Sequence, residues 1–424
     1  MLMTRSVFGF VLGAVLVSAA CTSVSPTLPR VTTSPAIVVE WNGIAQRVTI
    51  SVAKQYQTQS MIYIAMAQAA VYDAVTAIVG GYKPYALRVE RQPSASLDAA
   101  VASAAHGVLA YYFPDQRDAL DADLMRSLAA VPAGDAKEAG RAIGRAAVES
   151  LIAARRGDGL EVDIGFKMPS AALGAWQLPA GVSPQTPWVS RLRPFMLERP
   201  DQFRPGVPPS LGSRTWADDF LEVKTRGGTA AVARTDEQTE TATFWSTNSV
   251  TQFNVAFRQM VADRRLDAMS AARLFAMGNM VGADALIACF DAKYHHVFWR
   301  PQYAIPTGSI QINASTAGDG EWKPLLPTPN HPEYPAAHGC LTAAEASTLA
   351  AFAGSDRIDA TLRSNLPKLS QTVRTYERAD EMVREVSNAR VWGGLHYRRS
   401  VDVGADLGRK VAGWSLERYF QAEK

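Results

Sequence analysis

The spacing of apolar residues along this chain is predominantly that of α-helices. Residues 60–79, "SMIYIAMAQAAVYDAVTAIV", carry apolar side chains at helical intervals with small alanines between them, which suits close helix packing. Similar patterns predict further helices near 97–112, 115–130, 134–155, 235–262, 266–297, 340–354, 370–389 and 399–420. We therefore expect an all-α fold in which two packed helical bundles form one compact body.

Two segments lack this helical periodicity. Residues 22–50 are rich in Ser, Thr, Pro and Val, and we expect a tether followed by an irregular or short-stranded lead-in. Residues 157–213 hold many prolines and several glycines, which predicts a long excursion between two helical halves. The helical domain should then span 51–424, with the candidate chemistry in its second half, 235–424.

The first 21 residues differ from the rest of the chain. A positive start, "MLMTR", precedes an apolar run, "SVFGFVLGAVLV", and a small-residue region, "SAAC", which is typical of a bacterial export signal and too short for a membrane span. Because this region ends in Cys21, it resembles a lipoprotein signal whose cysteine is acylated, although Ser18 stands where leucine is usual. We expect an exported protein, periplasmic or lipid-anchored at the envelope, with membrane contact only through that anchor. The alternative is a buried N-terminal helix.

Composition excludes one class of function. Of the 424 residues, 47% are hydrophobic and 20% are charged, as expected for a globular chain with a large core. The 43 basic residues are balanced by 40 acidic ones, so the concentrated basic surface that nucleic-acid binding requires is absent from the sequence. Cys289 and Cys340 could pair in an oxidising compartment, but two cysteines make no disulfide framework, and we favour free buried thiols.

Cationic and imidazole side chains gather at a predicted helix end in "KYHHVFWRP", residues 293–301. The helix should stop before Pro301, which places Lys293 on its last turns and Arg300 in the exit. Two long cations that converge from a helix end can clamp an oxyanion. The alternative is that they only cap the helix C-terminus. We interpret His295 and His296, which lie between them, as structural.

Two further clusters follow within about a hundred residues. In "PTPNHPEYPAAHGC" a proline-rich lead-in precedes a helix that should open near His338. Such an opening can bind an anion beside an imidazole suited to proton transfer, although a surface or capping histidine is the alternative. In "NARVWGGLHYRRS" the Gly393-Gly394 pair should break a helix and turn His396 toward the same point as Arg390.

In this order, the three clusters resemble the signature K-x6-R-P, P-S-G-H and S-R-x5-H-x3-D. Vanadium-dependent haloperoxidases share that signature with type 2 phosphatidic acid phosphatases and acid phosphatases. The stretches "AAVYDAV", "ADALIACFDAKY" and "GADLGRKVAGW" also look like the bacterial haloperoxidase branch, so the resemblance covers residues 55–424. It implies the helical fold of that superfamily.

The resemblance implies an oxyanion site. Lys293, Arg300 and Arg390 would bind the oxygens of a vanadate cofactor or of a substrate phosphate, next to Ala336 and Ala337, which match the serine and glycine of the signature. Several fixed cations are what a tetrahedral, highly charged anion needs in a partly dry site.

The resemblance also gives the histidines their roles. His396 would be the axial ligand of vanadium or, in a phosphatase, the nucleophile that accepts the phosphoryl group. His338 would be the acid–base residue that protonates bound peroxide or the leaving alcohol. His331 matches a position where bromoperoxidases resemble one another in carrying histidine and chloroperoxidases in carrying phenylalanine, which favours bromide or iodide. The alternative is a histidine that merely ends a proline-rich loop.

The chain departs from the signature at four positions, Ala336, Ala337, Ala389 and Ser400. The last matters most, because Ser400 replaces the aspartate that in the family orients the histidine equivalent to His396 and raises its basicity. Losing that carboxylate should harm a phosphohistidine mechanism more than it harms coordination of vanadate.

Three functions stay open at this point. The first, which the sequence favours, is an exported vanadium-dependent haloperoxidase that oxidises bromide or iodide with hydrogen peroxide. The second is an acid or lipid phosphatase that cleaves a phosphate ester through a phosphohistidine and needs no cofactor. The third is a degenerate site that binds phosphate or vanadate without turnover. One scaffold can host all three.

Overall fold

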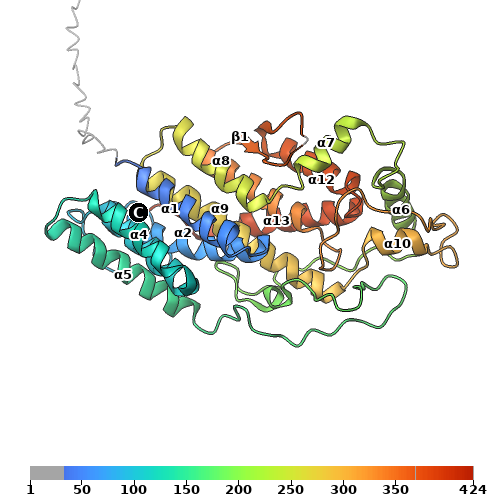
Figure 1. Cartoon of the computed structure of the whole chain (residues 1–424), viewed down its shortest axis with the longest axis horizontal. Coiled ribbons are helices and arrows are strands. Elements are labelled where there is room, and N and C mark those ends of the chain that lie inside the picture. The colour runs from blue at the N-terminus through green and yellow to red at the C-terminus, as the bar shows by residue number, and fades with distance from the viewer. Residues whose placement is uncertain (1–32, 368, 424) are drawn as a thin grey trace, which may run out of the picture. The chain divides into compact units, whose positions relative to one another are not determined.

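Helices dominate residues 33–367 and 369–423, which the computed structural model describes (Figure 1). In chain order the elements are α1 (Ala36–Gln46), α2 (Gln57–Val79), α3 (Leu97–Tyr112), α4 (Arg117–Ala129), α5 (Asp135–Arg155), α6 (Arg214–Arg226), α7 (Asp236–Phe244), α8 (Ser249–Asp263), α9 (Ala268–His296), α10 (Pro301–Thr307), α11 (Ala337–Ala353), β1 (Arg357–Arg363), β2 (Val373–Arg378), α12 (Ala379–Trp392) and α13 (Arg398–Arg418). The two strands pair antiparallel. The predicted all-α class is confirmed, with this hairpin as an addition.

The helices pack as two groups joined at the centre. In the N-terminal half α3 packs on α5 and α2, and in the C-terminal half α11 packs on α13, α9 and α12. The extensive contact between α2 and α9 joins the halves. In Figure 1, α4 and α5 lie at one end of this arrangement, and α6 and α10 lie at the other.

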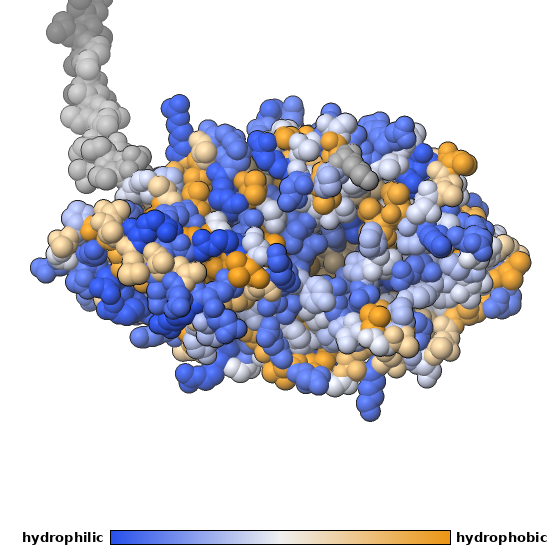
Figure 2. All heavy atoms as spheres, viewed as in Figure 1, coloured by the Kyte–Doolittle hydropathy of each residue, from blue (hydrophilic) through white to orange (hydrophobic). Residues whose placement is uncertain are grey.

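The central helices owe their apolar character to burial. Every residue from Ser60 to Ile78 of α2 and from Leu274 to Lys293 of α9 is buried. Both helices are long and apolar enough by composition to cross a membrane, yet their most apolar windows are 94% and 100% buried inside the fold. The surface face in Figure 2 is mainly hydrophilic, with hydrophobic residues scattered over it. The apolar periodicity is therefore explained by the core.

Polar residues set where many helices start. A side chain accepts a hydrogen bond from a backbone N–H of the first turn at Ser96 of α3, Ser213 of α6, Thr235 of α7, Asn248 of α8 and Asp267 of α9. The predicted helix over 235–262 is two helices for this reason: the Asn248 side chain accepts the Thr251 N–H at 3.1 Å and starts a new helix.

Two local expectations are wrong. Residues 36–52 are helical, not irregular or short-stranded: Trp41 is fully buried, and α1 packs on α3, so tertiary burial overrides the strand preference of the valines and isoleucines. The helix expected from 370 begins only at Ala379, because residues 373–378 form β2 with Tyr376 buried. The helices α6 and α10 were not expected.

The proline-rich excursion is held by a buried carboxylate. The only regular element within 157–213 is the short helical turn Pro187–Arg191. Asp284 of α9 accepts the backbone N–H groups of Phe195, Met196 and Leu197 at 2.6, 2.7 and 3.0 Å. The Tyr294 hydroxyl donates to the Gln185 carbonyl at 2.5 Å. These contacts bring the excursion to the end of α9 that carries the candidate chemistry.

Two cysteines are described, and both are free and buried, as expected. The predicted export signal over residues 1–21 and the lipidation candidate Cys21 lie outside the described residues.

Candidate functional site

Lys293 lies on the last turn of α9, as predicted, and its side chain is fully buried. The helix ends after His296 because Val297 adopts a left-handed conformation with φ of 46°. The Lys293 ammonium donates to the carbonyls of Pro332 at 2.8 Å and Glu333 at 2.9 Å. Burial lowers the pKa of Lys293 to about 8, so the ammonium still carries most of its charge at neutral pH.

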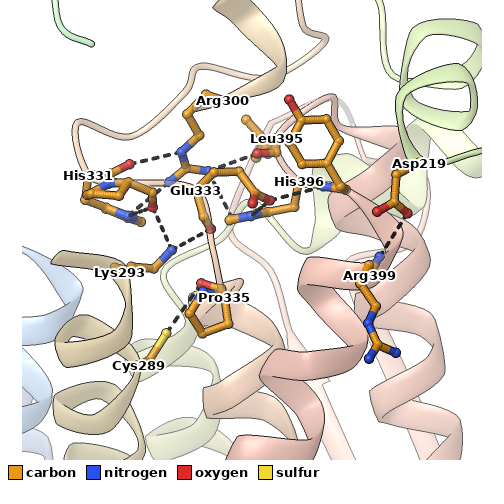
Figure 3. A network of polar contacts seen from close by, with 12 residues as sticks. Asp219, Cys289, Lys293, Arg300, His331, Glu333, Pro335, Leu395, His396 and Arg399 are labelled. Atoms are coloured by element: carbon orange, nitrogen blue, oxygen red, sulfur yellow. Dashed lines mark hydrogen bonds and ion pairs between the residues drawn. The ribbon is translucent and has the colours of Figure 1, made fainter. Parts of the chain in front are cut away.

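Arg300 joins three segments of the chain in the buried network of Figure 3. Its guanidinium donates to the carbonyls of His331 at 3.0 Å and Leu395 at 2.9 Å. It also lies 3.0 Å from two imidazole nitrogens, Nδ1 of His331 and Nε2 of His396. Burial lowers the pKa of Arg300 to about 10, which leaves the guanidinium charged.

Arg390 is the third buried cation, near the end of α12. One terminal nitrogen donates to the Trp245 carbonyl at 3.0 Å. Its Nε atom is buried and has no partner among the described residues. Burial lowers the pKa of Arg390 to about 9, so this side chain is also a cation at neutral pH.

The chain turns sharply to place His396. Gly394 has φ of +73°, and a Cβ there would lie 2.4 Å from the Gly227 carbonyl oxygen, so only glycine fits this turn. The His396 Nε2 atom accepts a hydrogen bond from Arg300, because a guanidinium can only donate. The imidazole proton must then be on Nδ1, which lies 2.8 Å from Oε1 of Glu333. Burial holds the pKa of His396 well below its usual value, and Arg300 lowers it further.

Glu333 is the site residue that the sequence analysis missed. Its side chain is fully buried, and Oε1 also accepts the Tyr397 N–H at 3.1 Å. Burial raises the pKa of Glu333 to about 7, against the opposing effect of Arg300 and Lys293. The available signal was an acidic residue inside the proline-rich "HPEYP". The family signature has its carboxylate at position 400 instead, where this chain carries Ser400.

His338 lies in the first turn of α11, close to where the helix was predicted to open. Its Nε2 atom is buried without a partner in the part of the chain that the structure describes. Burial keeps the pKa of His338 well below its usual value, and Arg390 lowers it further. The imidazole is therefore neutral at neutral pH and can accept a proton.

The two alanines at this helix opening differ. The Ala336 N–H donates to the Ser400 carbonyl at 3.1 Å, so this N–H already has an acceptor within the fold. Ala337 is the first residue of α11, where the N–H has no acceptor within the helix. Of the two, Ala337 therefore has the N–H that is available for an anion at the helix opening.

Five predicted site residues, His331, Ala337, His338, Arg390 and His396, line one cavity of about 340 Å³, whereas Lys293 and Arg300 are not among its lining residues. Apolar walls come from Leu286, Phe290 and Leu341, and a polar rim comes from residues 55–58, Gln185, Asn248 and Ser249. We call Lys293, Arg300, Arg390, His338 and His396 the oxyanion cradle. Neither His295 nor His296 lines this cavity.

Larger clefts elsewhere have their main charges paired. One of about 720 Å³ lies beside Arg204, which makes a two-pronged ion pair with Asp291 at 2.7 Å. Another, of about 800 Å³, lies beside Arg374, whose guanidinium is 2.8 Å from Glu385. Because these cations already have carboxylate partners, the smaller cavity is the stronger candidate for a binding site.

The oxyanion cradle carries uncompensated positive charge. The hydrogen bonds that Lys293, Arg300 and Arg390 make among the described residues go to carbonyls and imidazoles. Glu333 is the only carboxylate in this network within the described chain. Three cations against one carboxylate leave a buried excess of positive charge, which is costly without a further anion.

Fold and site together define a helical protein with a buried, cation-rich cluster beside a cavity. Residues 273–422 match the family model described as VCPO second helical-bundle domain. That range contains every member of the oxyanion cradle, and also Glu333.

The whole chain is similar to solved haloperoxidases. A bacterial vanadium-dependent iodoperoxidase is 19% identical, with a TM-score of 0.75 over 92% of this chain and 98% of that one. Bacterial vanadium-dependent chloroperoxidases in apo and holo form are each 19% identical. Their TM-scores are 0.71 and 0.69, over 86% and 85% of this chain and 94% and 91% of theirs. No curated protein matches the sequence. The fold is therefore that of vanadium-dependent haloperoxidases, and the predicted resemblance is confirmed at this level.

Proposed function

We propose that this protein is a vanadium-dependent haloperoxidase that oxidises bromide or iodide with hydrogen peroxide. The observation that carries the proposal is the uncompensated positive charge of the oxyanion cradle beside two neutral imidazoles. The haloperoxidase fold supports the choice of reaction, since the solved neighbours are an iodoperoxidase and chloroperoxidases.

The residues present fit vanadate. Arg390 Nε and His338 Nε2 are buried polar atoms without a partner among the described residues, and an oxyanion could supply one. Lys293, Arg300 and Arg390 would hold its oxygens. His396 Nε2 carries a lone pair and would be the nitrogen ligand of vanadium.

The chemistry that vanadate supplies when bound is Lewis acidity toward hydrogen peroxide. The three cations bind and orient the negatively charged group and keep it in a partly dry cavity. Glu333 holds the proton of His396 on Nδ1, so Nε2 keeps its lone pair and would be able to coordinate once Arg300 turns from it to the anion. His338, kept neutral by burial, can take a proton from hydrogen peroxide at Nε2 and return it to the product.

The halide preference is part of the proposal. His331 lines the cavity, and its Nδ1 atom lies 3.0 Å from Arg300. Histidine at position 331 supports bromide or iodide as the substrate, because in the family resemblance bromoperoxidases carry histidine here and chloroperoxidases carry phenylalanine. Its contact with Arg300 argues against the alternative of a histidine that merely ends a loop.

A phosphatase is the second candidate, and one observation favours it. Ser400 supplies no carboxylate to the histidine that a phosphohistidine mechanism needs. Glu333 supplies one instead, with Oε1 at 2.8 Å from Nδ1 of His396. The orienting group that a nucleophilic imidazole needs is present.

The test is a comparison of two activities on the same preparation. We expect oxidation of bromide and iodide that requires both added orthovanadate and hydrogen peroxide and that phosphate inhibits by competition. Hydrolysis of p-nitrophenyl phosphate that vanadate inhibits, without halide oxidation, would instead identify a phosphatase. Vanadate binding with neither activity would identify a non-catalytic anion-binding protein.

We further propose that the protein is exported, with Cys21 as a candidate for acylation. The support is the sequence pattern of residues 1–21 alone. Fractionation of a bacterial host, with labelled palmitate and a Cys21→Ser variant, tests both points. Label on the wild type but not on the variant supports the lipid anchor, and retention of the unprocessed chain in the cytoplasm contradicts export.

A further inference from the structure

The carboxylate that contacts His396 comes from an unexpected part of the chain. Oε1 of Glu333 lies 2.8 Å from Nδ1 of His396, although the two residues are 63 positions apart. Both side chains are almost completely buried, with 0% and 1% of their surface exposed. Figure 3 shows the Glu333 carboxylate beside the His396 imidazole. At this depth Nδ1 of His396 needs a hydrogen-bond partner, and Glu333 supplies it.

Glu333 is fixed at both its backbone and its side chain. Its N–H donates to the Phe298 carbonyl at 2.9 Å, and its own carbonyl accepts the Lys293 ammonium at 2.9 Å. Oε1 accepts the Tyr397 N–H at 3.1 Å as well as the His396 proton. The carboxylate is thereby held rigidly by the segments that carry the oxyanion cradle, as a group that orients another side chain must be.

The side chain at position 400 also lies beside the Glu333 carboxylate. Ser400 is 1% exposed, and its side chain lies next to Glu333. Oε2 of Glu333 and the Ser400 hydroxyl nevertheless make no hydrogen bond of good geometry among the described residues. The family signature has its aspartate at this position. A carboxylate at position 333 or an aspartate at position 400 could therefore reach the His396 ring. Carboxylates at both positions would place two negative charges in one buried space.

We propose that Glu333 is the positioning residue of His396. In the family signature an aspartate at position 400, on α13, orients this histidine. Here Glu333, in the segment that leads into α11, orients it instead. It keeps the proton on Nδ1 and strengthens the lone pair of Nε2 as the ligand that would bind vanadium. The catalytic consequence rests on the proposed function, whereas the hydrogen bond and its effect on anion affinity do not.

The variants Glu333→Gln and Glu333→Ala test the first half of this proposal. Loss of a carboxylate behind a coordinating histidine costs about 10- to 100-fold in affinity or activity, so we expect vanadate to bind weaker by that factor, measured by titration calorimetry. The downfield proton resonance of His396 Nδ1, identified by its absence from His396→Ala, should move upfield in both variants. Because Glu333→Gln preserves the side-chain volume, it still tests the proposal if the alanine variant does not fold.

Restoring the signature tests the second half. In the Glu333→Ala background, Ser400→Asp should recover at least about tenfold in vanadate affinity and return the downfield Nδ1 resonance. In the wild-type background the same Ser400→Asp change should weaken vanadate binding, because two carboxylates then share one site. Ser400→Ala is the matched control and should leave both readouts near the wild-type values.

The proposal is overturned if vanadate affinity and the Nδ1 resonance survive loss of the Glu333 carboxylate. It is equally overturned if folded Glu333→Ala/Ser400→Asp recovers neither readout. These readouts need no turnover. Absence of halide oxidation by the wild type would count against the proposed function, while the affinity and resonance data would still decide the role of Glu333.

Discussion

Two buried glutamates near opposite ends of one short stretch of chain show how surroundings decide the state of a carboxyl group. Glu333 precedes α11 and meets an imidazole, a backbone N–H and two nearby cations. Glu345 lies within α11, fully buried, and neither of its oxygens has a partner among the described residues. Burial raises the pKa of Glu345 well above its usual value. The first carboxyl belongs to a polar network, while the second is a neutral acid in the helical core.

Glycines make room for the second carboxyl. A Cβ at Gly282 would lie 2.6 Å from Oε1 of Glu345, and one at Gly278 would lie 2.4 Å from the Phe257 ring and 3.3 Å from Oε2 of Glu345. These glycines are one turn apart on α9, which lets that helix approach α11 around the acid. A polar residue in this core therefore needs either hydrogen-bond partners, as Glu333 has, or space, as Glu345 has. Only the carboxyl with partners, Glu333, can take part in a functional site.

The largest effect should come from Glu345→Gln, seen as a change in the pH dependence of unfolding. In the wild type the unfolded glutamate ionises near pH 4.5 while the folded one stays protonated, so stability falls as pH rises above that value. The slope is about 1.4 kcal/mol per pH unit wherever the unfolded carboxyl is ionised and the folded one is protonated. Glutamine does not titrate, so the variant should gain stability over the wild type as pH rises. Denaturant titrations at pH 4.5 to 7.5 measure this.

A matched control is Glu149→Gln on the exposed side of α5, which should leave the pH profile unchanged. Parallel profiles for wild type and Glu345→Gln would mean that Glu345 is ionised in the folded protein, and the contrast with Glu333 would disappear.

Arg390→Met should weaken vanadate binding by about 1.5 to 3 kcal/mol, or roughly 10- to 150-fold, because it removes hydrogen bonds to a charged group. Calorimetric titration of orthovanadate measures the loss. Arg384→Met removes a cation from the same helix whose side chain is 67% exposed, and it should bind vanadate like the wild type. Equal affinities for all three proteins would place the anion away from the oxyanion cradle.

Gly282→Ala should destabilise the fold by about 1 to 3 kcal/mol, since the new methyl group overlaps Glu345, Met61 and Leu341. Thermal or denaturant unfolding gives the value. Gly413→Ala in α13 meets nothing within 4 Å and should stabilise by about 0.5 to 1 kcal/mol through helix propensity. Stabilisation by both substitutions would show that Glu345 does not need the space at Gly282.

Local sequence signals located most of the site. Pro301 and the Gly393-Gly394 pair mark chain turns, and the spacing of cations and histidines around them placed Lys293 and His396 at those turns. These features were predictable because each depends on a few neighbouring residues.

Features that depend on distant contacts were not predictable. Glu333 gains its role from a residue 63 positions away, and no periodicity records such a contact. Likewise, α1 is a helix because Trp41 is buried against later helices, with its Nε1 donating to Ser127 at 3.2 Å. In both cases a residue that is distant in the sequence determines the role of Glu333 or the conformation of α1.

The most direct test of the central claim is a crystal structure of the full chain grown with orthovanadate. The account predicts density for a vanadium oxyanion bonded to His396 Nε2, with its oxygens within hydrogen-bonding distance of Lys293, Arg300 and Arg390. A saturated crystal with vanadate bound elsewhere, or with Arg300 still donating to His396 Nε2 and no anion in the cavity, would contradict it.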